Sequence, residues 1–379
     1  MTPALHTAEE LAALQALPLD QKIRISVTRI IEWYTRNNGN VYVSFSGGKD
    51  STVLLHLVRR IYPDIPAVFV DTGLEYPEIR QFVKSFENVT LLRPKMMFTD
   101  VVSRYGYPIL SKEIAEAIHY ARKHNSGRAD KCPVRRQMFM GVLASDAAHA
   151  DKPSLFDKQK YLPVVRDLPV VISHYCCNIM KKNPAHAYAD QSQSAPIIGT
   201  MTEESRLRKQ AWLKHGCNVF EGRHTSSQPL SFWTEQDILS YTKEHGLQLA
   251  APYGDIVSVD ASGNVCDGNC ECCKLKTTGA DRTGCIFCGF GLHNESKKDL
   301  SRFQSLALTH PKQYDYCIGG GQWVENPHYD PCLSSKPDKF GWVHWNPKQI
   351  WAPSKEGLGM GKVFDMCNEI YGKDFMRYQ

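Results

Sequence analysis

Hydrophobic residues follow two different periods along the first hundred residues. Apolar, β-branched runs at 41–45, 67–70 and 89–92 are short, which is typical of buried strands. Between these runs, the apolar positions of 51–61 and 76–86 recur at helical spacing. A strand, a helix and a second strand in close succession predict a βαβ unit, and therefore a parallel sheet with a right-handed crossover.

Helical spacing recurs outside this unit, with prolines and glycines between the helices. A strand at 195–199 precedes a helix, for which the capping-box pair Thr200 with Glu203, or Thr202 with Ser205, predicts a cap. Thr234 is expected to cap another helix, with Asp237 in its first turn. Further helices are predicted at residues 8–16, 20–34, 111–124 and 137–147.

Two stretches show little regular period. Residues 148–170 contain three prolines, and we expect an irregular insertion on the surface there. Residues 319–362 are rich in Gly, Pro and Trp, which predicts a loop-rich cap with buried tryptophans. The alternative is a set of exposed aromatics beside lysines that stack on bases.

The turn between the first strand and its helix is the strongest candidate for chemistry. It reads Ser46-Gly47-Gly48-Lys49-Asp50. Its two glycines let the backbone turn sharply, and the helix that follows presents unpaired N–H groups that favour anions. Lys49 adds a charge suited to phosphate, and we expect it and Asp50 in an open crevice. The second strand ends in Asp-Thr-Gly at 71–73, which should line the same crevice, because ligands of such sheets bind at the carboxyl ends of strands.

Three segments carry a resemblance to a known family. Ser-Gly-Gly-Lys-Asp-Ser at 46–51 resembles the pyrophosphate loop of the N-type ATP pyrophosphatases, the PP-loop superfamily. Residues 71–78 resemble a second signature of its phosphoadenylyl-sulfate (PAPS) reductase branch, where a strand-end Asp-Thr-Gly lies near the adenosine. Glu-Ser-Arg-x-Arg at 204–208 resembles the family's phosphate- and substrate-binding segment, although Met201 stands where the family usually has arginine. The chain is identified as a member of the PAPS reductase family.

The resemblance implies a fold, a division into domains and a nucleotide site. The fold would be α/β, with a parallel-sheet, adenine nucleotide alpha hydrolase-like (Rossmann-like) core and a cysteine-rich, loop-rich C-terminal region. Lys49 and Asp50 would be catalytic, with ATP held together with Mg²⁺. The expected segments are N-terminal helical, PP-loop nucleotide-binding, cysteine-rich metal-binding and C-terminal appendage, at 1–37, 38–258, 259–293 and 294–379. The implied nucleotide-binding residues are Ser46, Gly47, Gly48, Lys49, Asp50, Ser51, Asp71, Thr72, Gly73, Glu204, Ser205, Arg206 and Arg208.

The chain has 13 cysteines, an odd number that is partly grouped in pairs, and this favours metal ligation over a disulfide framework. The adjacent Cys176 and Cys177 resemble the segment that supplies two iron-sulfur ligands in assimilatory adenylyl-sulfate reductases. With Cys285-x-x-Cys288 they would provide the four thiolates that a [4Fe-4S] cluster needs. A zinc site or a rearranged ligand set remains the alternative. Its ligands would come from the dense group Cys266, Cys270, Cys272 and Cys273, with Cys270-x-Cys272-Cys273 and Cys285-x-x-Cys288 together holding zinc.

The complete loop separates the reactions of the family. Sulfonucleotide reductases tend to lose the full Ser-Gly-Gly-Lys-Asp-Ser, and they need a cysteine in a C-terminal tail that residues 371–379 do not offer. We therefore expect an enzyme that adenylates an acceptor, releases pyrophosphate and passes sulfur to the activated carbon. The alternatives are a sulfonucleotide reductase and a non-catalytic nucleotide- or nucleic-acid-binding module.

Charge and hydropathy set the expected partners. A net charge of +5 permits an anionic partner without requiring one, and basic residues gather at 131–136, 181–182 and 206–209. The expected partners are an adenine nucleotide, a sulfur donor and an acceptor that is RNA, DNA or a small molecule. No apolar run of about 18 residues and no signal-peptide pattern occurs, so we expect a cytoplasmic protein with no membrane partner. The sequence does not indicate an oligomeric state.

Overall fold

The computed structural model describes residues 5–123, 134–141, 158–222, 225–268, 272–295, 298–338 and 341–379. The chain forms two compact units. The first comprises Met1–Lys95 and Met180–Cys285, and the second comprises Met96–Ile179 and Ile286–Gln379. Each unit is therefore built from two separate stretches of chain, whereas the domains expected from the sequence are consecutive segments.

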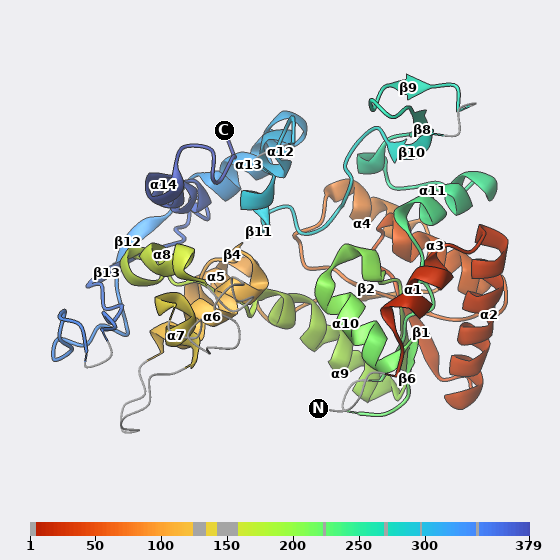
Figure 1. The fold of residues 1–379 in the computed structure, drawn as a ribbon, viewed down its shortest axis with the longest axis horizontal. Coiled ribbons are helices and arrows are strands. Elements are labelled where there is room, and N and C mark those ends of the chain that lie inside the picture. The colour runs from red at the N-terminus through yellow and green to blue at the C-terminus, as the bar shows by residue number, and fades with distance from the viewer. Residues whose placement is uncertain are drawn as a thin grey trace. The chain divides into compact units, whose positions relative to one another are not determined.

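The first unit is built on a six-stranded sheet in the order β3-β2-β1-β5-β7-β6. Its strands β1, β2 and β6 are labelled in Figure 1. Neighbouring strands are parallel except for β6 and β7, which are antiparallel, so the predicted parallel sheet is confirmed. The predicted βαβ unit is confirmed as well. Its strands are β1 (Val41–Ser44), β2 (Ala67–Val70), β3 (Val89–Leu92), β5 (Ala195–Ile198), β6 (Asn218–Val219) and β7 (Ser226–Ser227).

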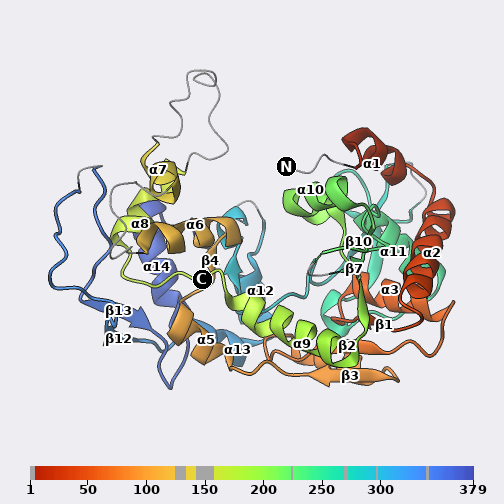
Figure 2. The ribbon, with the colours of Figure 1, turned by 90° about the horizontal axis from the view of Figure 1, so that it is seen from below.

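Helices cover both faces of this sheet because alternate side chains of a strand point to opposite sides. On one side, Val41 and Val43 of β1 join a buried cluster with residues of α2 and α3. Figure 2 labels these three elements. On the other side, Tyr42 packs against Tyr188 of α9, with ring centroids 5.1 Å apart. The helices of this unit are α1 (Ala8–Gln15), α2 (Leu19–Arg36), α3 (Lys49–Arg59), α4 (Pro77–Lys84), α9 (Asn183–Ser192), α10 (Arg206–His215) and α11 (Glu235–Glu244).

The two predicted helix caps have different outcomes. Thr234 caps α11 as predicted, since its Oγ1 accepts from the Asp237 N–H at 3.3 Å and Asp237 Oδ2 accepts from the Thr234 N–H at 2.7 Å. The cap predicted at Thr200 or Thr202 is wrong. A short 3₁₀ turn, Thr202–Glu204, comes first, and Ser205 then caps α10 by accepting from the Arg208 N–H.

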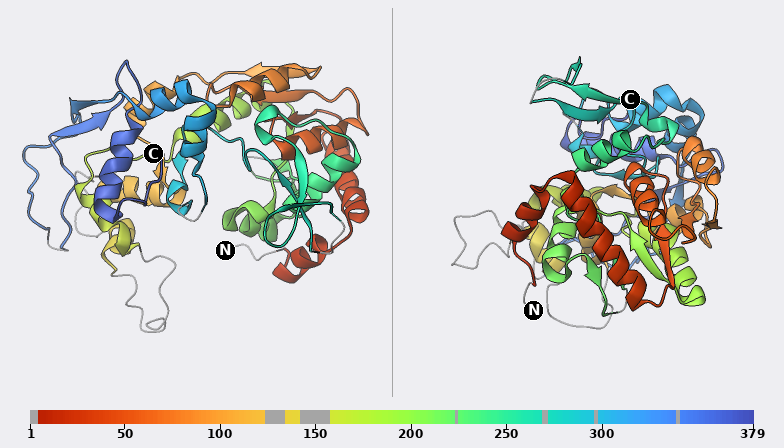
Figure 3. Two further views of the ribbon diagram at one scale, coloured as in Figure 1. Left: turned by 90° about the horizontal axis from the view of Figure 1, so that it is seen from above. Right: turned by 90° about the vertical axis from the view of Figure 1, so that its right-hand side faces the viewer.

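A small antiparallel sheet in the order β10-β8-β9 belongs to the same unit and is drawn in teal in Figure 3. It consists of β8 (Ile256–Val259), β9 (Val265–Cys266) and β10 (Lys274–Thr277). Its strands carry or adjoin Cys266, Cys272 and Cys273, the described members of the second cysteine group predicted to bind metal.

The second unit has a helical core and two small sheets. The strands β4 (Ile109–Leu110) and β11 (Gly289–Phe290) pair in parallel, and β12 (Gln322–Glu325) pairs antiparallel with β13 (Gln349–Ala352). Buried residues such as Phe139, Phe303 and Phe364 fill its interior. Its helices are α5 (Phe98–Tyr105), α6 (Lys112–Arg122), α7 (Val134–Met140), α8 (Leu162–Asp167), α12 (Arg302–Thr309), α13 (Pro311–Ile318) and α14 (Met360–Tyr371).

The expected surface insertion at 148–170 is wrong for its described part. Residues 162–167 form α8, and Val164, Val165 and Leu168 are buried. Pro163 lies in the first turn of this helix, where proline is tolerated because its missing N–H has no partner to lose. Residues 148–157 lie outside the described residues.

Other sequence expectations for the second unit are met in part. The expected helix at 137–147 begins earlier, at Val134, and ends at Met140, whereas residues 142–147 lie outside the described ones. The 319–362 stretch contains the β12 and β13 pair, so it is more regular than expected. Trp342 and Trp345 are buried as predicted, but Trp323 is exposed. Among the described helices, none is long and apolar enough to cross a membrane.

Candidate nucleotide site

The turn at 46–50 joins β1 to α3, and its shape requires glycine. Gly47 has φ +71°, a conformation that side chains of L residues rarely adopt. A Cβ on Gly47 would also lie 2.8 Å from Val83 Cγ2 and 2.9 Å from Ile79 Cγ2, both on α4. The backbone therefore turns tightly against α4, and α3 begins directly at Lys49.

The serines at the two ends of the motif hold this turn in place. Ser46 donates its backbone N–H to Ser51 Oγ at 3.2 Å, and the two hydroxyls are 3.0 Å apart. Ser51 Oγ in turn donates to the Gly48 carbonyl at 2.9 Å. Both serines thus shape the loop, whatever contact they make with a ligand.

Lys49 is buried rather than open to a crevice, so that expectation is wrong. It is only 5% exposed. Its Nζ donates to the Asp281 carbonyl at 2.8 Å and pairs with Glu235 Oε1 at 3.1 Å. Burial opposes the charge, but Asp50, Tyr253 and Glu235 outweigh it and raise the pKa of Lys49, so the ammonium stays charged. The physical reason for its burial is the later chain segment that lies over it.

Asp50 lies beside this ammonium, and one of its carboxylate oxygens makes no hydrogen bond to the described residues. This oxygen, Oδ1, is buried. Burial raises the pKa of Asp50, while the charges of Lys49 and Arg282 lower it in part. A carboxylate oxygen without a protein partner is the kind of ligand that Mg²⁺ accepts.

Residues 281–283 bring further polar groups to the loop. The Arg282 side chain pairs with Glu204, and Arg208 of α10 pairs with the same carboxylate. Thr283 Oγ1 lies 2.8 Å from the Tyr253 hydroxyl, which also accepts from the Lys49 backbone N–H at 3.1 Å.

Sequence reasoning missed Arg282, Glu235 and Tyr253. Lys49 and Asp281 are 232 positions apart in the chain, and Lys49 and Tyr253 are 204 apart. No linear spacing signals contacts of this range. The structure confirms only that Glu204 and Arg208, both predicted site residues, lie together beside these groups.

The predicted residues at the end of β2 form a separate hydrogen-bonded group. Asp71 accepts from Arg80 at 2.7 Å and from the Gly73 N–H at 3.2 Å. Thr72 donates its hydroxyl to Glu75 at 2.8 Å. β1 and β2 are parallel neighbours, so this group lies at the same edge of the sheet as the loop.

The other predicted residues of α10 have different roles in this structure. Ser205 is the helix cap described above, and Arg206 is exposed. Neither role tests whether they bind nucleotide, so both stay predictions.

The cysteines predicted to hold a cluster are not gathered into a metal site by the described residues. In the part of the chain that the structure describes, no three His, Cys, Asp or Glu side chains come together as metal ligands. Cys285 ends the first unit, whereas Cys176, Cys177 and Cys288 belong to the second. The [4Fe-4S] assignment therefore stays a prediction.

The alternative cysteine group lies at the small antiparallel sheet. Cys266 Sγ and Cys273 Sγ are 3.2 Å apart. Cys272 is exposed, and Cys270 lies outside the described residues. Cys273 is part of a disulfide in this structure, whereas zinc takes free thiolates, so a zinc site here is likewise still a prediction.

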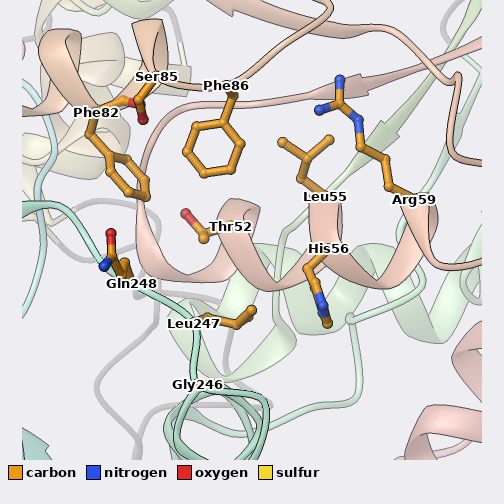
Figure 4. Close-up of a pocket in the computed structure, with 10 residues that line it drawn as sticks. All are labelled: Thr52, Leu55, His56, Arg59, Phe82, Ser85, Phe86, Gly246, Leu247 and Gln248. Carbon is orange, nitrogen blue, oxygen red and sulfur yellow. The ribbon is translucent and has the colours of Figure 1, made fainter.

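A cavity of about 330 Å³ also borders α3 (Figure 4). It lies along the side of this helix, whereas the loop lies at its N-terminus. Leu55, Phe82 and Phe86 make its apolar wall. Its cations and polar rings already have protein partners: Arg59 donates to the Asn88 carbonyl at 3.0 Å, and His56 Nδ1 lies 3.0 Å from the Tyr241 hydroxyl. The cations of the loop site, Lys49, Arg208 and Arg282, are not among the residues that line this cavity.

A parallel sheet whose first strand turns through glycines into a helix defines an α/β protein of the nucleotide-binding type. The model of the phosphoadenosine phosphosulfate reductase domain matches residues 40–255, more than half of the chain, so the chain belongs to this family. The α/β fold with a central, mostly parallel sheet that the sequence predicts is confirmed. Proteins of this family are enzymes, and adenine nucleotide binding is expected of them.

Similar curated proteins match short stretches. The phosphoadenosine 5'-phosphosulfate reductase of Yersinia enterocolitica is 36% identical over 109 residues, which are 27% of this chain and 44% of the relative. The enzyme of the same name from Pectobacterium carotovorum is 40% identical over 81 residues, 21% of this chain and 33% of the relative. An uncharacterized protein of Methanocaldococcus jannaschii is 33% identical over 95 residues, 24% and 23% of the two chains. The chain thus spans less than half the length of these relatives.

Two solved structures show a more distant likeness. A phosphoadenylyl-sulfate reductase from Candida auris in a phosphate complex matches with a TM-score of 0.33 and 13% identity, over 65% of this chain and 91% of the other. The U34-tRNA thiolase NcsA from Methanococcus maripaludis, with its [4Fe-4S] cluster, matches with a TM-score of 0.27 and 14% identity, over 62% and 68%. At these TM-scores neither likeness bears on the roles of residues.

Proposed function

We propose that the protein binds Mg·ATP at residues 46–51, transfers the adenylyl group to an acceptor and releases pyrophosphate. One observation carries this proposal: the charges of Lys49, Arg208 and Arg282 all act on Asp50, at the turn where α3 begins. These three cations lie beside a helix N-terminus and pair with Glu235 or Glu204 in this structure, and the phosphates of a polyphosphate would replace those carboxylates as partners. A triphosphate, whose charge Mg²⁺ partly neutralises, fits a site with three cationic side chains.

In the proposed first step, an oxygen of the acceptor attacks the α-phosphorus of ATP. A new P–O bond forms, the bond from the α-phosphorus to the bridging oxygen breaks, and pyrophosphate leaves with that oxygen. Lys49 and the loop N–H groups would hold the β and γ phosphates, and Asp50 would help to place Mg²⁺. Stabilising the charge of the leaving pyrophosphate would be the largest contribution to the rate.

In the proposed second step, a sulfur donor at the oxidation level of sulfide attacks the activated carbon of the acceptor. A C–S bond forms, the C–O bond to AMP breaks, and AMP leaves, so the step needs no oxidant or reductant. Cys176, Cys177, Cys285 and Cys288 have the thiolate donors that a [4Fe-4S] cluster requires. When bound, such a cluster would supply an iron site that can hold sulfur.

The acceptor is proposed to be RNA, DNA or a small molecule. The basic residues Lys181 and Lys182 follow the Cys176-Cys177 pair, which supports a nucleic acid. If so, retention of RNA or DNA should weaken steeply with salt, because each phosphate contact releases counterions. Binding that ignores salt, or no retention at low salt, would point to a small molecule.

A reductase is the second candidate, favoured by the phosphoadenosine 5'-phosphosulfate reductases among the similar curated proteins. It would release sulfite from adenylyl sulfate or its 3'-phosphorylated form with a thiol reductant. A non-catalytic nucleotide-binding module would instead bind ATP tightly without turnover. One set of assays separates the three, since the products are AMP with pyrophosphate, sulfite, or none.

The cluster has its own test. Protein prepared without oxygen should be brown and hold about four irons per chain, and Cys288→Ser should lose most of them. Stoichiometric zinc without iron would instead support the group that includes Cys266 and Cys273.

A further inference from the structure

Residues 281–283, here called the strap, lie over the phosphate loop. The Asp281 carbonyl accepts from Lys49 Nζ at 2.8 Å. Thr283 Oγ1 lies 2.8 Å from the Tyr253 hydroxyl, to which the Lys49 backbone N–H donates. Even a Cβ on Gly48 would come within 3.2 Å of that hydroxyl. The strap and the loop are therefore packed together at several points.

Arg282 lies between Asp281 and Thr283, and its side chain pairs with a carboxylate that also pairs with another arginine. Glu204 pairs with both Arg282 and Arg208 and accepts from the Met201 N–H at 3.3 Å. Burial lowers the pKa of Arg208, and the nearby charge of Arg282 lowers it further. Two guanidinium groups thus share one carboxylate beside the loop.

Arg282 differs from Arg208 and Lys49 in its freedom to change partners. Its side chain is 66% exposed, whereas that of Arg208 is 37% exposed. A phosphate offers several charged oxygens in a geometry that suits the planar guanidinium group, and it need not be shared. A polyphosphate at the loop would therefore compete well with Glu204 for Arg282.

We propose that Arg282 is a phosphate ligand of the nucleotide site, which it reaches by exchanging Glu204 for the polyphosphate. The inference rests on the proposed nucleotide function and adds a ligand from the strap to it. Glu204 holds the arginine while the site is empty of nucleotide. Arg282 is three residues before Cys285, so its bond to the polyphosphate would also hold in place the segment that leads into the Cys-x-x-Cys pair.

Binding to the full-length protein tests the ligand role directly. Calorimetry with Mg·ATP and with inorganic pyrophosphate should show Arg282→Ala binding both about tenfold or more weakly, the scale for losing a charge-assisted hydrogen bond. Arg282→Lys should fall between it and the unaltered protein. Arg24→Ala is the matched control, since Arg24 is an exposed arginine that also has a carboxylate partner, and it should change nothing.

The exchange itself predicts an opposite effect for Glu204→Gln. Removing this charge frees both arginines, so pyrophosphate should bind several-fold more tightly. A loss equal to that of Arg282→Ala would mean that the ion pair only positions the chain, and it would overturn the exchange.

Trypsin reports on the same arginine without any turnover or cluster. Pyrophosphate should slow cleavage after Arg282 several-fold, because a phosphate-bound guanidinium cannot enter the protease, and should leave cleavage after the exposed Lys355 unchanged. Unchanged cleavage after Arg282 would overturn the proposal.

These outcomes are separable from those of the proposed reaction. Binding that depends on Arg282 without formation of AMP overturns the reaction alone. Equal affinity of Arg282→Ala and the unaltered protein overturns this inference alone. Failure of the unaltered protein to bind either ligand overturns both.

Discussion

Lys49 in the first unit and Arg122 in the second are both buried cations, but their partners differ in kind. Arg122 donates to four backbone carbonyls, those of residues 164, 165, 168 and 170, at 2.6 to 3.0 Å. Lys49 has one such carbonyl and otherwise faces Glu235, half of whose side chain is exposed, and Asp50, which has an unpartnered oxygen. A cation bound by backbone carbonyls has a role in stability. A cation that faces an exposed side chain and a carboxylate oxygen without a partner is typical of a ligand site.

Arg122 shows what a structural cation looks like. Its guanidinium also lies 4.3 Å from the centre of a Trp345 ring. Burial lowers the pKa of Arg122 to about 9, so it remains charged at neutral pH. The hydrogen bonds of the Arg122 guanidinium go to the chain in and after α8. Arg122 is the last residue of α6, so these bonds connect α6 to α8.

Arg122→Ala should give the largest effect on stability. It would leave buried carbonyls without donors, and we expect a loss of about 3 kcal/mol or more in the free energy of unfolding. Chemical denaturation measures this. Arg166→Ala is the control, because Arg166 is half-exposed and should change stability by less than about 1 kcal/mol. Equal effects of the two variants would break the comparison.

Asp50→Asn should lower activity without lowering stability, whereas Arg122→Ala should lower stability. Turnover should fall on the order of 10²-fold or more, the scale for removing a charge that is fixed toward the transition state. The melting temperature of the ligand-free protein should rise slightly at neutral pH, because the fold raises the pKa of Asp50 and so disfavours its charged form. A marked fall in melting temperature would assign Asp50 a structural role.

The pH dependence of Mg·ATP binding should report the same carboxylate. Because burial raises the pKa of Asp50 above 3.8, protons should displace Mg²⁺ as the pH falls through a range that lies above that ordinary value. Stability has the opposite sign, since the contribution of Asp50 is largest at low pH and is lost as the pH rises through its folded pKa. Titration calorimetry across pH checks the binding, and Asp50→Asn should remove this dependence.

Thr234→Ala should give the smallest effect. It removes the α11 cap and should cost about 1 kcal/mol of unfolding free energy. Turnover should hardly change if the cap is only structural. A loss of turnover comparable to that of Asp50→Asn would show that the position of α11, and with it Glu235, matters for catalysis.

The sequence predicted what depends on near neighbours in the chain. The phosphate loop needs only a strand, two glycines and a helix, and all of these lie within 41–61. The Thr234 cap likewise depends on a residue three positions later. Such features follow from local hydrogen bonding and spacing, so a reader of the sequence can find them.

The sequence could not supply what tertiary packing brings together. Arg282 and Tyr253 reach the loop across more than 200 positions, and no spacing rule connects them to Lys49. Pro163 is among the prolines that predict an irregular stretch at 148–170, but the first turn of a helix accepts proline. Burial of Lys49 was missed for the same reason as Arg282, because the strap that covers it comes from the far end of the first unit.

The nucleotide products test the central claim most directly. Anaerobically purified protein is incubated with Mg·ATP and total RNA or DNA, and separately with adenylyl sulfate and a thiol. An adenylating enzyme should form AMP and pyrophosphate from ATP, and Lys49→Ala should reduce both on the order of 10²-fold or more while the protein stays folded. Sulfite from adenylyl sulfate, with ATP left untouched, would contradict this claim and identify the loop as the site of a reductase.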